Sequence, residues 1–374
     1  MKIISKIAVI AVFLMIFPFV GALQAQETLK IGFSGALTRA FAPYGLSNLY
    51  GMECAVNEIN AAGGVLGKQV EIVPLDDECE PENAIAVAKE FIKQGITLII
   101  GHSCSEATEA ALEVYGDKAL VISGSATKTS LTESGKNPYF FRTGLRDDAA
   151  TGSQIQYLKD KGFKNVAIVH DDTDYGVGVS EIINAKLTSD PSGISVALFE
   201  GINSAEDSFD KIISQIAASK ADVLVWTGVY NDATKLIIGL KDKGLNLPIL
   251  SSDALFTQSF INQAGLNAEG IVLSVATDPS TSKEAQQAIK DHHSRHAEDI
   301  GPYFFNAAGA TKALLAAVSS VGNTTDLAAI KKHLGEDTVE TIQGPVRFDS
   351  KGDIIGVKIQ LVIVKDGKFV PLTN

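Results

Sequence analysis

The stretch L-I-I-G-H-S-C-S-E-A-T, residues 98–108, carries the clearest structural signal in this chain. An apolar run ends at Gly101, small polar residues follow, and a helical pattern continues from Glu109. This order predicts a buried parallel strand that passes through a polar loop into a helix, with Ser105 at the N-cap. A helix N-terminus presents free N–H groups and a partial positive charge, so it suits an anionic group.

The same pattern returns in L-V-I-S-G-S-A-T, residues 120–127. Two adjacent strand ends that present Ser and Thr to one crevice can hold a small anion such as a carboxylate. Neither loop contains a Walker lysine or a G-x-G-x-x-G motif, so the sequence does not indicate phosphate binding.

Residues 1–25 have the pattern of a secretory signal peptide. Lys2 and Lys6 precede an apolar run over 7–20, and small residues lead to a predicted cleavage site after Ala25. The alternative is a membrane anchor, but the run is shorter than the about 20 apolar residues that a spanning helix needs. No later segment is expected to cross a membrane. The sequence therefore predicts an exported, periplasmic protein.

The 374-residue chain has a net charge of −12, and loss of the two lysines of the signal peptide would make it −14. An acidic exported protein is a poor partner for nucleic acid or anionic lipid. The remaining length is sufficient for two domains with well-buried cores.

The chain contains three cysteines, and export permits disulfides. Cys54 lies in an amphipathic helical pattern and is predicted to be a buried free thiol. Cys79 and Cys104 each follow a strand at the same edge of the predicted sheet. We expect them to pair, with two free thiols as the alternative. Closing that loop would contribute about 3 kcal/mol.

Strand and helix patterns alternate along most of the chain. The first series has strands at 29–33, 70–75, 98–100 and 120–123 and helices at 50–59 and 81–94. The second series has helices at 149–161, 178–187, 207–217 and 232–243, and strands at 166–169, 194–199, 223–226, 248–250 and 270–275. Helical patterns follow at 282–296, 303–321 and 327–334, and strand patterns at 346–348 and 357–364. Such alternation predicts two doubly wound α/β lobes, and we expect the two lobes to enclose a cleft between them.

Ligands of doubly wound sheets bind beyond the carboxyl ends of the strands. In the first lobe these ends are rich in hydroxyl groups and helix N-termini: Ser34, Asp76, Asp77, 103–105 and 125–127. In the second lobe they carry aromatic and acidic side chains: 170–172, Tyr175, 227–230 and 251–253. This asymmetry suits a zwitterion. The alternative for any single residue is that loops are polar in general.

Two residues have equally simple alternative roles. Tyr44 precedes the first predicted helix, and it either forms an aromatic wall over a ligand or packs on the sheet edge. Asp253 either holds an ammonium group or caps the helical segment that follows it.

Catalytic and metal motifs are weak. His292 and His296 are spaced i, i+4 and could bind a metal, but the surrounding charge favours a solvated helix face. His102 and His170 follow strands, yet no Ser-His-Asp order, G-x-S-x-G elbow or H-E-x-x-H motif is present. The Gly pattern at 175–178 is a weak dinucleotide signal. The sequence therefore predicts no catalytic residues, no metal and no cofactor.

Several segments together resemble the periplasmic branched-chain amino acid (Leu/Ile/Val) binding proteins of ABC importers. The resemblance runs from about Leu29 to Val364. It is carried by G-A-L-T, P-Y-G-L, A-V-N-E-I-N-A-A-G-G-V-L-G-K, L-D-D-E-C-E-P-E-N-A-I-A-V-A, I-I-G-H-S-C-S, I-S-G-S-A-T, H-D-D-T-D-Y-G-V-G, G-P-Y-F-F-N-A-A and F-D-S-K-G-D.

The resemblance implies the type I fold, with two Rossmann-like lobes joined by crossings near Leu145, Val275 and Gly356. The N-terminal lobe would comprise 26–145 and 276–356, and the C-terminal lobe 146–275 and 357–374. It also implies the Cys79–Cys104 disulfide. A monomer would deliver its ligand to an inner-membrane ABC permease.

The resemblance further implies a set of ligand contacts. Ser105 and Thr127 would hold the α-carboxylate, and Ser103 and Ala126 would supply main-chain contacts. Tyr175 and Tyr230 would close over the ligand, Tyr44 would form a wall, and Asp253 would bind the α-ammonium group.

Two departures bear on specificity. Branched-chain binders often carry Glu within a G-P-E-G-like loop where this chain has Asp253, whose side chain is one methylene shorter. Ser103 stands where an apolar residue is common. We therefore predict capture of a free amino acid, most simply an aliphatic one. The alternatives are urea, a short amide, an aromatic acid or a polar amino acid on the same fold, a sensor module, and an exported hydrolase that uses His102 or His170.

Overall fold

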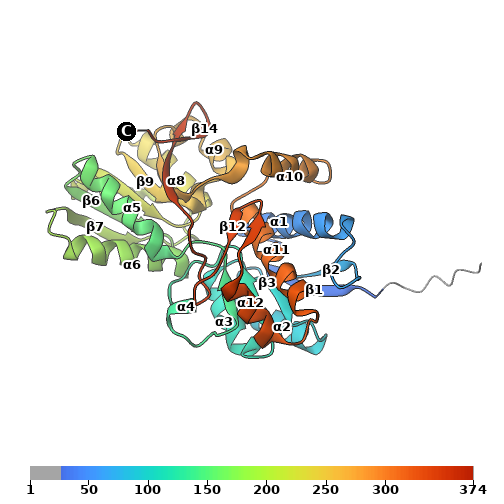
Figure 1. Ribbon diagram of the computed structural model, residues 1–374. Coiled ribbons are helices and arrows are strands. Elements are labelled where there is room, and N and C mark those ends of the chain that lie inside the picture. The colour runs from blue at the N-terminus through green and yellow to red at the C-terminus, as the bar shows by residue number, and fades with distance from the viewer. Residues whose placement is uncertain (1–26, 374) are drawn as a thin grey trace, which may run out of the picture.

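The computed structural model describes residues 27–373, and the predicted signal peptide lies outside them. Two lobes stand side by side, each built on its own sheet (Figure 1). The first sheet is fully parallel with the order β2-β1-β3-β4-β5. Its strands are β1 (Leu29–Gly35), β2 (Val70–Asp76), β3 (Leu98–Gly101), β4 (Leu120–Ser123) and β5 (Phe140–Arg142).

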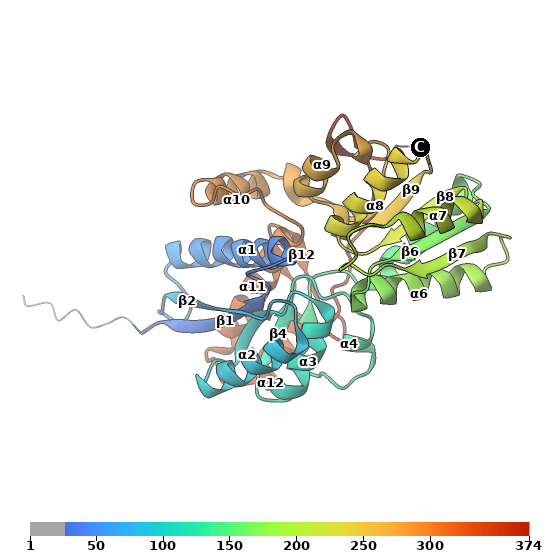
Figure 2. The same cartoon turned by 180° about the vertical axis from the view of Figure 1, so that it is seen from behind.

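Helices cover both faces of the first sheet (Figure 2). One apolar core joins the sheet to α1 (Ala42–Ala61), α11 (Phe304–Val321) and α12 (Leu327–Glu336). A second core joins the opposite face to α2 (Pro81–Lys93) and α3 (Ser105–Tyr115). The first lobe also contains α4 (Ser130–Glu133), α10 (Lys283–His293), β11 (Val339–Thr341) and β12 (Gly344–Val346).

The second sheet has the order β14-β13-β10-β9-β8-β6-β7. Its strands β6 (Asn165–His170), β7 (Ser195–Gly201), β8 (Val223–Thr227), β9 (Ile249–Ser252) and β10 (Val272–Ala276) are parallel. β13 (Ile359–Lys365) and β14 (Lys368–Pro371) add an antiparallel edge. Its helices are α5 (Asp147–Asp160), α6 (Asp174–Ser189), α7 (Asp210–Ser219), α8 (Tyr230–Asp242) and α9 (Gln258–Ala264), with short 3-10 turns at Asp253–Leu255, Gly265–Ala268 and Pro279–Thr281.

The chain passes from one sheet to the other three times. It leaves the first sheet after β5, returns to the first lobe after β10, and enters the second sheet again before β13. Elements from both ends of the chain therefore complete the first lobe, as the blue and red ribbons around its sheet illustrate (Figure 1). The domain boundaries given above stay predictions.

The first helix begins eight residues earlier than predicted, so Tyr44 lies within α1 and not in a loop before it. Pro43 stands in the first turn, where its missing N–H is harmless. Gly45 and Gly51 weaken the helical signal in the sequence, but both allow close packing. A Cβ at Gly45 would lie 1.8 Å from the Ala36 carbonyl oxygen, and one at Gly51 would lie 2.0 Å from that of Phe304.

The expectation that no later segment could cross a membrane is wrong on length and composition alone. Helix α11 has 18 residues and enough apolar side chains, yet 61% of it is buried in the protein. It packs along α1 and over the first sheet, so it is a core helix of this lobe.

The solvated helix face predicted for His292 is also wrong. The His292 side chain is 1% exposed, and its Nε2 atom lies 2.7 Å from the Glu298 carbonyl oxygen. Its ring stacks on that of His296 at 5.0 Å and meets Phe304 edge-on. The reason is that α10 turns this face toward α1, where Tyr50 covers both imidazoles.

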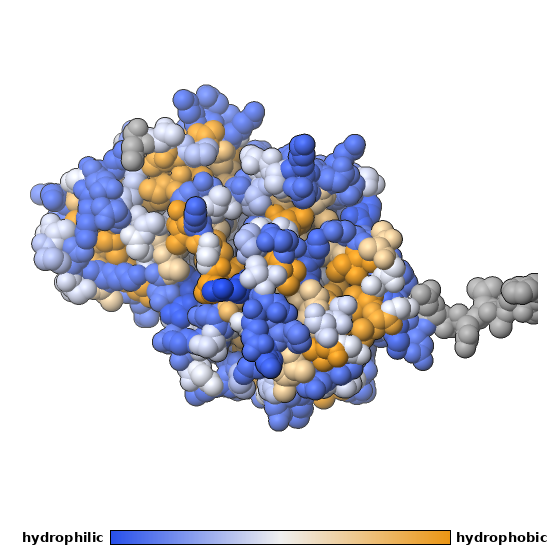
Figure 3. Space-filling view, viewed as in Figure 1, coloured by the Kyte–Doolittle hydropathy of each residue, from blue (hydrophilic) through white to orange (hydrophobic). Residues whose placement is uncertain are grey.

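The visible surface is mostly polar. Hydrophilic side chains cover much of both lobes, and apolar groups form smaller patches between them (Figure 3).

Candidate functional site

A cavity of about 50 Å³ lies between the lobes, beyond the carboxyl ends of the strands of both sheets. The first lobe contributes mostly hydroxyl groups to its wall: Tyr44, Ser103, Ser105, Ser125 and Thr127, with Phe41, Cys104, Glu106 and Tyr303. The second lobe contributes Thr173, Tyr175, Val229 and Ala254. The predicted crevice between two Ser/Thr strand ends is therefore present and is faced by aromatic side chains.

Ser105 is the first residue of α3, and Cys104 is the N-cap, so the predicted N-cap role of Ser105 is wrong by one residue. Its Oγ atom instead accepts a hydrogen bond from the Lys128 N–H at 3.2 Å. This contact joins the β3–α3 loop to the β4 loop. Ser105 still presents its hydroxyl to the cavity at the positive end of a helix.

Ala126 does not have the free main-chain groups that the resemblance implied. Its N–H donates to Ser123 Oγ at 2.9 Å, and its carbonyl accepts from Arg142 Nη1 at 3.2 Å. The neighbouring Ser125 lines the cavity in its place. Ser125 Oγ donates to the Ser103 carbonyl at 2.8 Å and accepts from Asn48 at 3.2 Å.

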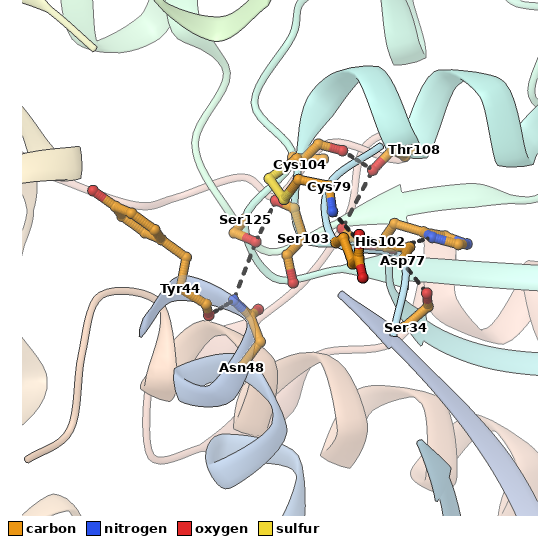
Figure 4. Close-up of a disulfide and its surroundings, with 12 residues drawn as sticks. Ser34, Tyr44, Asn48, Asp77, Cys79, His102, Ser103, Cys104, Thr108 and Ser125 are labelled. Carbon is orange, nitrogen blue, oxygen red and sulfur yellow. Dashed lines mark hydrogen bonds and ion pairs between the residues drawn. A yellow bond between two sulfur atoms is a disulfide. The ribbon is translucent and has the colours of Figure 1, made fainter. Parts of the chain in front are cut away.

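A disulfide joins Cys79 to Cys104, with a Cα–Cα distance of 5.4 Å, which confirms the predicted pairing. Cys54 is free and half-buried. Figure 4 shows the disulfide beside the buried contact of Asp77 with His102, whose Oδ2 and Nδ1 atoms lie 2.6 Å apart. Together these links attach the Ser105 loop to the end of β2.

Tyr44 reaches from α1 to the second lobe. In Figure 4 its ring points away from the disulfide loop, while Asn48 below it turns back toward Ser125. Tyr44 Oη donates to the Ala254 carbonyl at 2.9 Å and accepts from the Tyr230 N–H at 3.2 Å. It therefore lines the cavity and also joins the two lobes.

Tyr230 does not line the cavity with its ring, contrary to the implied role. The residue is 2% exposed and belongs to the core of the second lobe. The preceding Val229 lines the cavity. Helix α8 begins at Tyr230, and Val229 before it is the N-cap with an extended backbone. Neighbouring residues at such a junction point in different directions, so Val229 faces the cavity and Tyr230 faces the core.

Asp253 lines a small adjoining cavity of about 20 Å³ with Asp147, Tyr175 and Thr127. Burial raises the pKa of Asp253 to about 6, although its own N–H, that of Ala254 and the Tyr303 hydroxyl donate to it. Tyr175 Oη lies 2.6 Å from Ser252 Oγ beside it. A buried carboxylate near hydroxyl groups is suited to pair with a cation.

Sequence reasoning missed three residues of this region: Glu106, Asp147 and Tyr303. Asp147 and Glu106 are the first and second residues of helices, a position where acidic residues usually stabilise the helix end. Their sequence positions are explained by this helix-end role, so no separate sequence signal indicates that they line a cavity. Burial raises the pKa of each carboxyl to about 7. Tyr303 has φ of 68°, which no sequence pattern indicated.

The histidines considered for catalysis are engaged elsewhere. His102 is fully buried, and its two ring nitrogens contact Asp77 and Tyr115. His170 Nδ1 lies 2.6 Å from the Asp171 carbonyl oxygen. Neither histidine lines the cavity between the lobes.

Comparison with known proteins identifies the family. The model of a periplasmic binding protein family matches residues 28–368. The chain belongs to the periplasmic binding protein family. The Leu/Ile/Val-binding protein of Escherichia coli K12 is 28% identical over 331 residues, covering 88% of this chain and 89% of that protein. A Pseudomonas aeruginosa protein named for binding leucine, isoleucine, valine, threonine and alanine is 29% identical and covers 88% of each chain.

Among solved structures, a branched-chain amino acid transporter substrate binding protein of Streptococcus pneumoniae, in complex with isoleucine, superposes with a TM-score of 0.81. It is 24% identical and covers 92% of this chain and 98% of its own. The predicted type I fold of the periplasmic binding protein family is thereby confirmed.

Proposed function

We propose that this periplasmic binding protein captures a free amino acid in the cleft and delivers it to an inner-membrane ABC permease. The observation that carries the proposal is that a hydroxyl-lined helix end in the cavity between the lobes lies beside an adjoining cavity lined by the acid Asp253, with Thr127 and Tyr175 lining both cavities. The names of the two curated relatives support an aliphatic amino acid. The family supports a periplasmic location and a solute-binding role without catalysis.

The two charged ends of an amino acid match the two walls. Ser105, at the start of α3, and Thr127 would bind the α-carboxylate, because hydroxyl groups and a helix N-terminus favour an anion. Asp253 would bind the α-ammonium group. In water-excluded surroundings each charge needs a partner, and this arrangement supplies one for each.

Lobe closure would trap the ligand without making or breaking a covalent bond. Tyr44 and Tyr175 line the cavity from opposite lobes. A ligand that contacts both lobes stabilises the closed form over the open one, because only the closed form offers both sets of contacts. The protein would act as a monomer, with one site per chain.

The test has two parts. Mass spectrometry of solutes released from denatured, freshly purified protein should detect an amino acid. Calorimetry with free amino acids should then give a Kd in the micromolar range or tighter, and Asp253→Asn should weaken it at least about 100-fold through loss of a buried ion pair.

Asp242→Asn, at the exposed end of α8, is the matched control and should bind like the wild type. Retained affinity in Asp253→Asn, or release of urea or an aromatic acid, would contradict capture of an amino acid.

A further inference from the structure

A pair of histidines joins three helices of the first lobe, at a place that the proposed ligand contacts do not use. Helix α10 lies alongside α1 (Figures 1 and 2). The His292 side chain of α10 is 1% exposed, and its ring stacks on that of His296 at 5.0 Å. The Tyr50 ring of α1 lies 4.9 Å from His292 and 4.1 Å from His296. His292 also meets Phe304, the first residue of α11, edge-on at 5.7 Å.

Helix α10 has little other buried contact. Apart from His292, it buries only two small side chains, Ala285 and Ala288. Ala288 belongs to a small apolar cluster that is separate from the two main cores of the first lobe. Two alanines bury little apolar area, and elements with few buried apolar contacts open at a low free energy. The attachment of α10 therefore depends strongly on the state of His292.

A positive charge on His292 would have no counter-ion. Among the residues that the structure describes, no carboxylate pairs with this side chain. Glu53 pairs with His296, with Oε2 and Nε2 2.9 Å apart, and Asp299 lies 3.4 Å from His293. A buried charge without a partner is strongly unfavourable, so His292 suits this place only as the neutral ring.

The surroundings of His292 act in the same direction. Charged and titratable groups face the cluster from α1, from α10 and from the loop after α10: Tyr50, Glu53, His293, Arg295, His296, Glu298 and Asp299. Burial lowers the pKa of His292, and positive charge on its neighbours lowers it further. The Glu298 carbonyl, 2.7 Å from Nε2, opposes this shift but does not outweigh it.

The segment after α10 leads directly to the cleft. Residues 294–303 run from α10 to Tyr303, which precedes Phe304 and lines the cavity between the lobes. The Tyr303 hydroxyl donates to Asp253 and favours its ionised form. If this segment moved, Asp253 would lose a donor and accept a proton more readily.

We propose that His292 is a positioning residue, which holds Tyr303 against Asp253 while the imidazole is neutral and releases α10 and residues 294–303 when it is protonated. The consequence for ligand affinity rests on the proposed function, whereas the release of α10 does not.

The direction of the pH effect follows from burial. The attached form of α10 binds a proton on His292 less readily than the released form does. Attachment is therefore complete above the ordinary histidine pKa of about 6.5 and weakens as the pH falls below it, by up to about tenfold per pH unit.

Hydrogen exchange of the ligand-free wild type tests the release of α10. After correction for the intrinsic pH dependence of amide exchange, protection of α10 and residues 294–303 should fall about tenfold between pH 7 and pH 5. Helix α2, which lies in the same lobe and contains no histidine, is the internal reference and should keep its protection.

Substitutions then assign the effect to one residue. His292→Gln is neutral at every pH and keeps an N–H that can reach the Glu298 carbonyl, so its α10 should exchange equally at pH 7 and pH 5. His293→Gln is the matched control, because the neighbouring His293 side chain is 44% exposed, and it should behave like the wild type.

Calorimetry at pH 7 and pH 5, with an amino acid that binds the wild type, tests the link to the cleft. The rise in Kd on acidification should be about fivefold smaller in His292→Gln than in the wild type or His293→Gln, because the variant keeps one hydrogen bond to Asp253.

Each result decides a separate step. Constant protection of α10 in the wild type, or equal loss of protection in His292→Gln, would overturn the role of His292 as the releasing group. Release of α10 with the same Kd ratio in all three proteins would overturn its control of Tyr303. If no amino acid binds the wild type, amino-acid capture is wrong, and hydrogen exchange still decides whether His292 releases α10.

Discussion

At the scale of single residues, Asp253 combines two properties that usually exclude one another. It is deep within the protein, yet its partly accessible carboxyl faces the cavities at the cleft and behind it. Burial raises its pKa to about 6, while three hydrogen-bond donors favour the ionised form. A cation from the ligand would restore the charge that burial disfavours, and this links binding to pH.

Amino-acid affinity should therefore fall in acid. An ammonium group binds the ionised form of Asp253, so below about pH 6 protonation competes, and Kd should rise up to about tenfold per pH unit. Of the other groups that face this site, Tyr44, Tyr175 and Tyr303 stay neutral because burial raises their pKa values. Burial raises the pKa of Asp147 to about 7, so its protonation would start to weaken ligand binding at a slightly higher pH than the protonation of Asp253.

Calorimetry with one amino acid between pH 8 and pH 5 measures this dependence. The weak residual binding of Asp253→Asn should vary much less with pH. A wild-type Kd that is constant over the whole range would show that no carboxylate of the cleft binds the ammonium group.

At the scale of elements, the loops after β2, β3 and β4 are fixed by contacts outside the sheet. The disulfide joins the β2 loop to the β3 loop, and Ser105 accepts from the β4 loop. The buried ion pair of Arg142 and Asp353 joins β5 to the segment between β12 and β13, before the chain enters the second sheet for the last time. The Arg142 Nε and Asp353 Oδ1 atoms lie 2.6 Å apart. These links join the loops that form the binding wall of the first lobe to one another and to the C-terminal part of the lobe.

Removing the disulfide should lower stability and loosen the Ser105 loop. The Cys79→Ser, Cys104→Ser double variant should lose about 3 kcal/mol of unfolding free energy, measured by urea denaturation. Cys54→Ser, at the free half-buried thiol, is the control and should lose less than about 1 kcal/mol. An unchanged midpoint in the double variant would mean that other contacts fix the loop.

Breaking the buried ion pair should have a larger effect. Asp353→Asn leaves the fully buried Arg142 guanidinium without its carboxylate, and Thr132, which donates to Asp353, loses an acceptor oxygen. We expect a loss of about 3–5 kcal/mol in the same measurement. Lys93→Met removes the exposed pair with Glu90 and should change stability by less than about 1 kcal/mol. Comparable effects of the two substitutions would refute the structural role given to Arg142.

At the scale of the whole molecule, the two lobes meet through few polar contacts across the cleft. Tyr44 Oη bonds the backbone of both Ala254 and Tyr230, and Lys128 pairs with Asp174 of α6. These contacts involve side chains of one lobe and groups of the other, so they can form only when the lobes are close. Ligand binding and these contacts should therefore support one another.

Tyr44→Phe should weaken ligand affinity without weakening the lobes themselves. Loss of two hydrogen bonds between the lobes should raise Kd about tenfold. At a ligand concentration below saturation, small-angle X-ray scattering should give a larger radius of gyration than for the wild type, because more molecules are open. Tyr139→Phe, which alters a half-buried tyrosine within the first lobe, should bind like the wild type. Unchanged affinity in Tyr44→Phe would mean that this contact does not contribute to closure.

The sequence by itself determined the alternating α/β pattern, the strand–loop–helix unit at 98–108, the Cys79–Cys104 pair and the position of Asp253 beside the cleft. These features can be read from nearby residues. Burial determines how apolar residues are spaced along a strand or helix, and the signal-peptide pattern indicates export to a compartment where cysteines can form disulfides. Tertiary structure alone decided that Ser125 and Val229, and not Ala126 and Tyr230, line the cavity. It also placed Glu106 at the cavity between the lobes and Asp147 at the adjoining cavity, although both stand in the first turn of a helix. The physical reason is that the direction of a side chain in a loop changes with each residue, and only the packing of the two lobes fixes it.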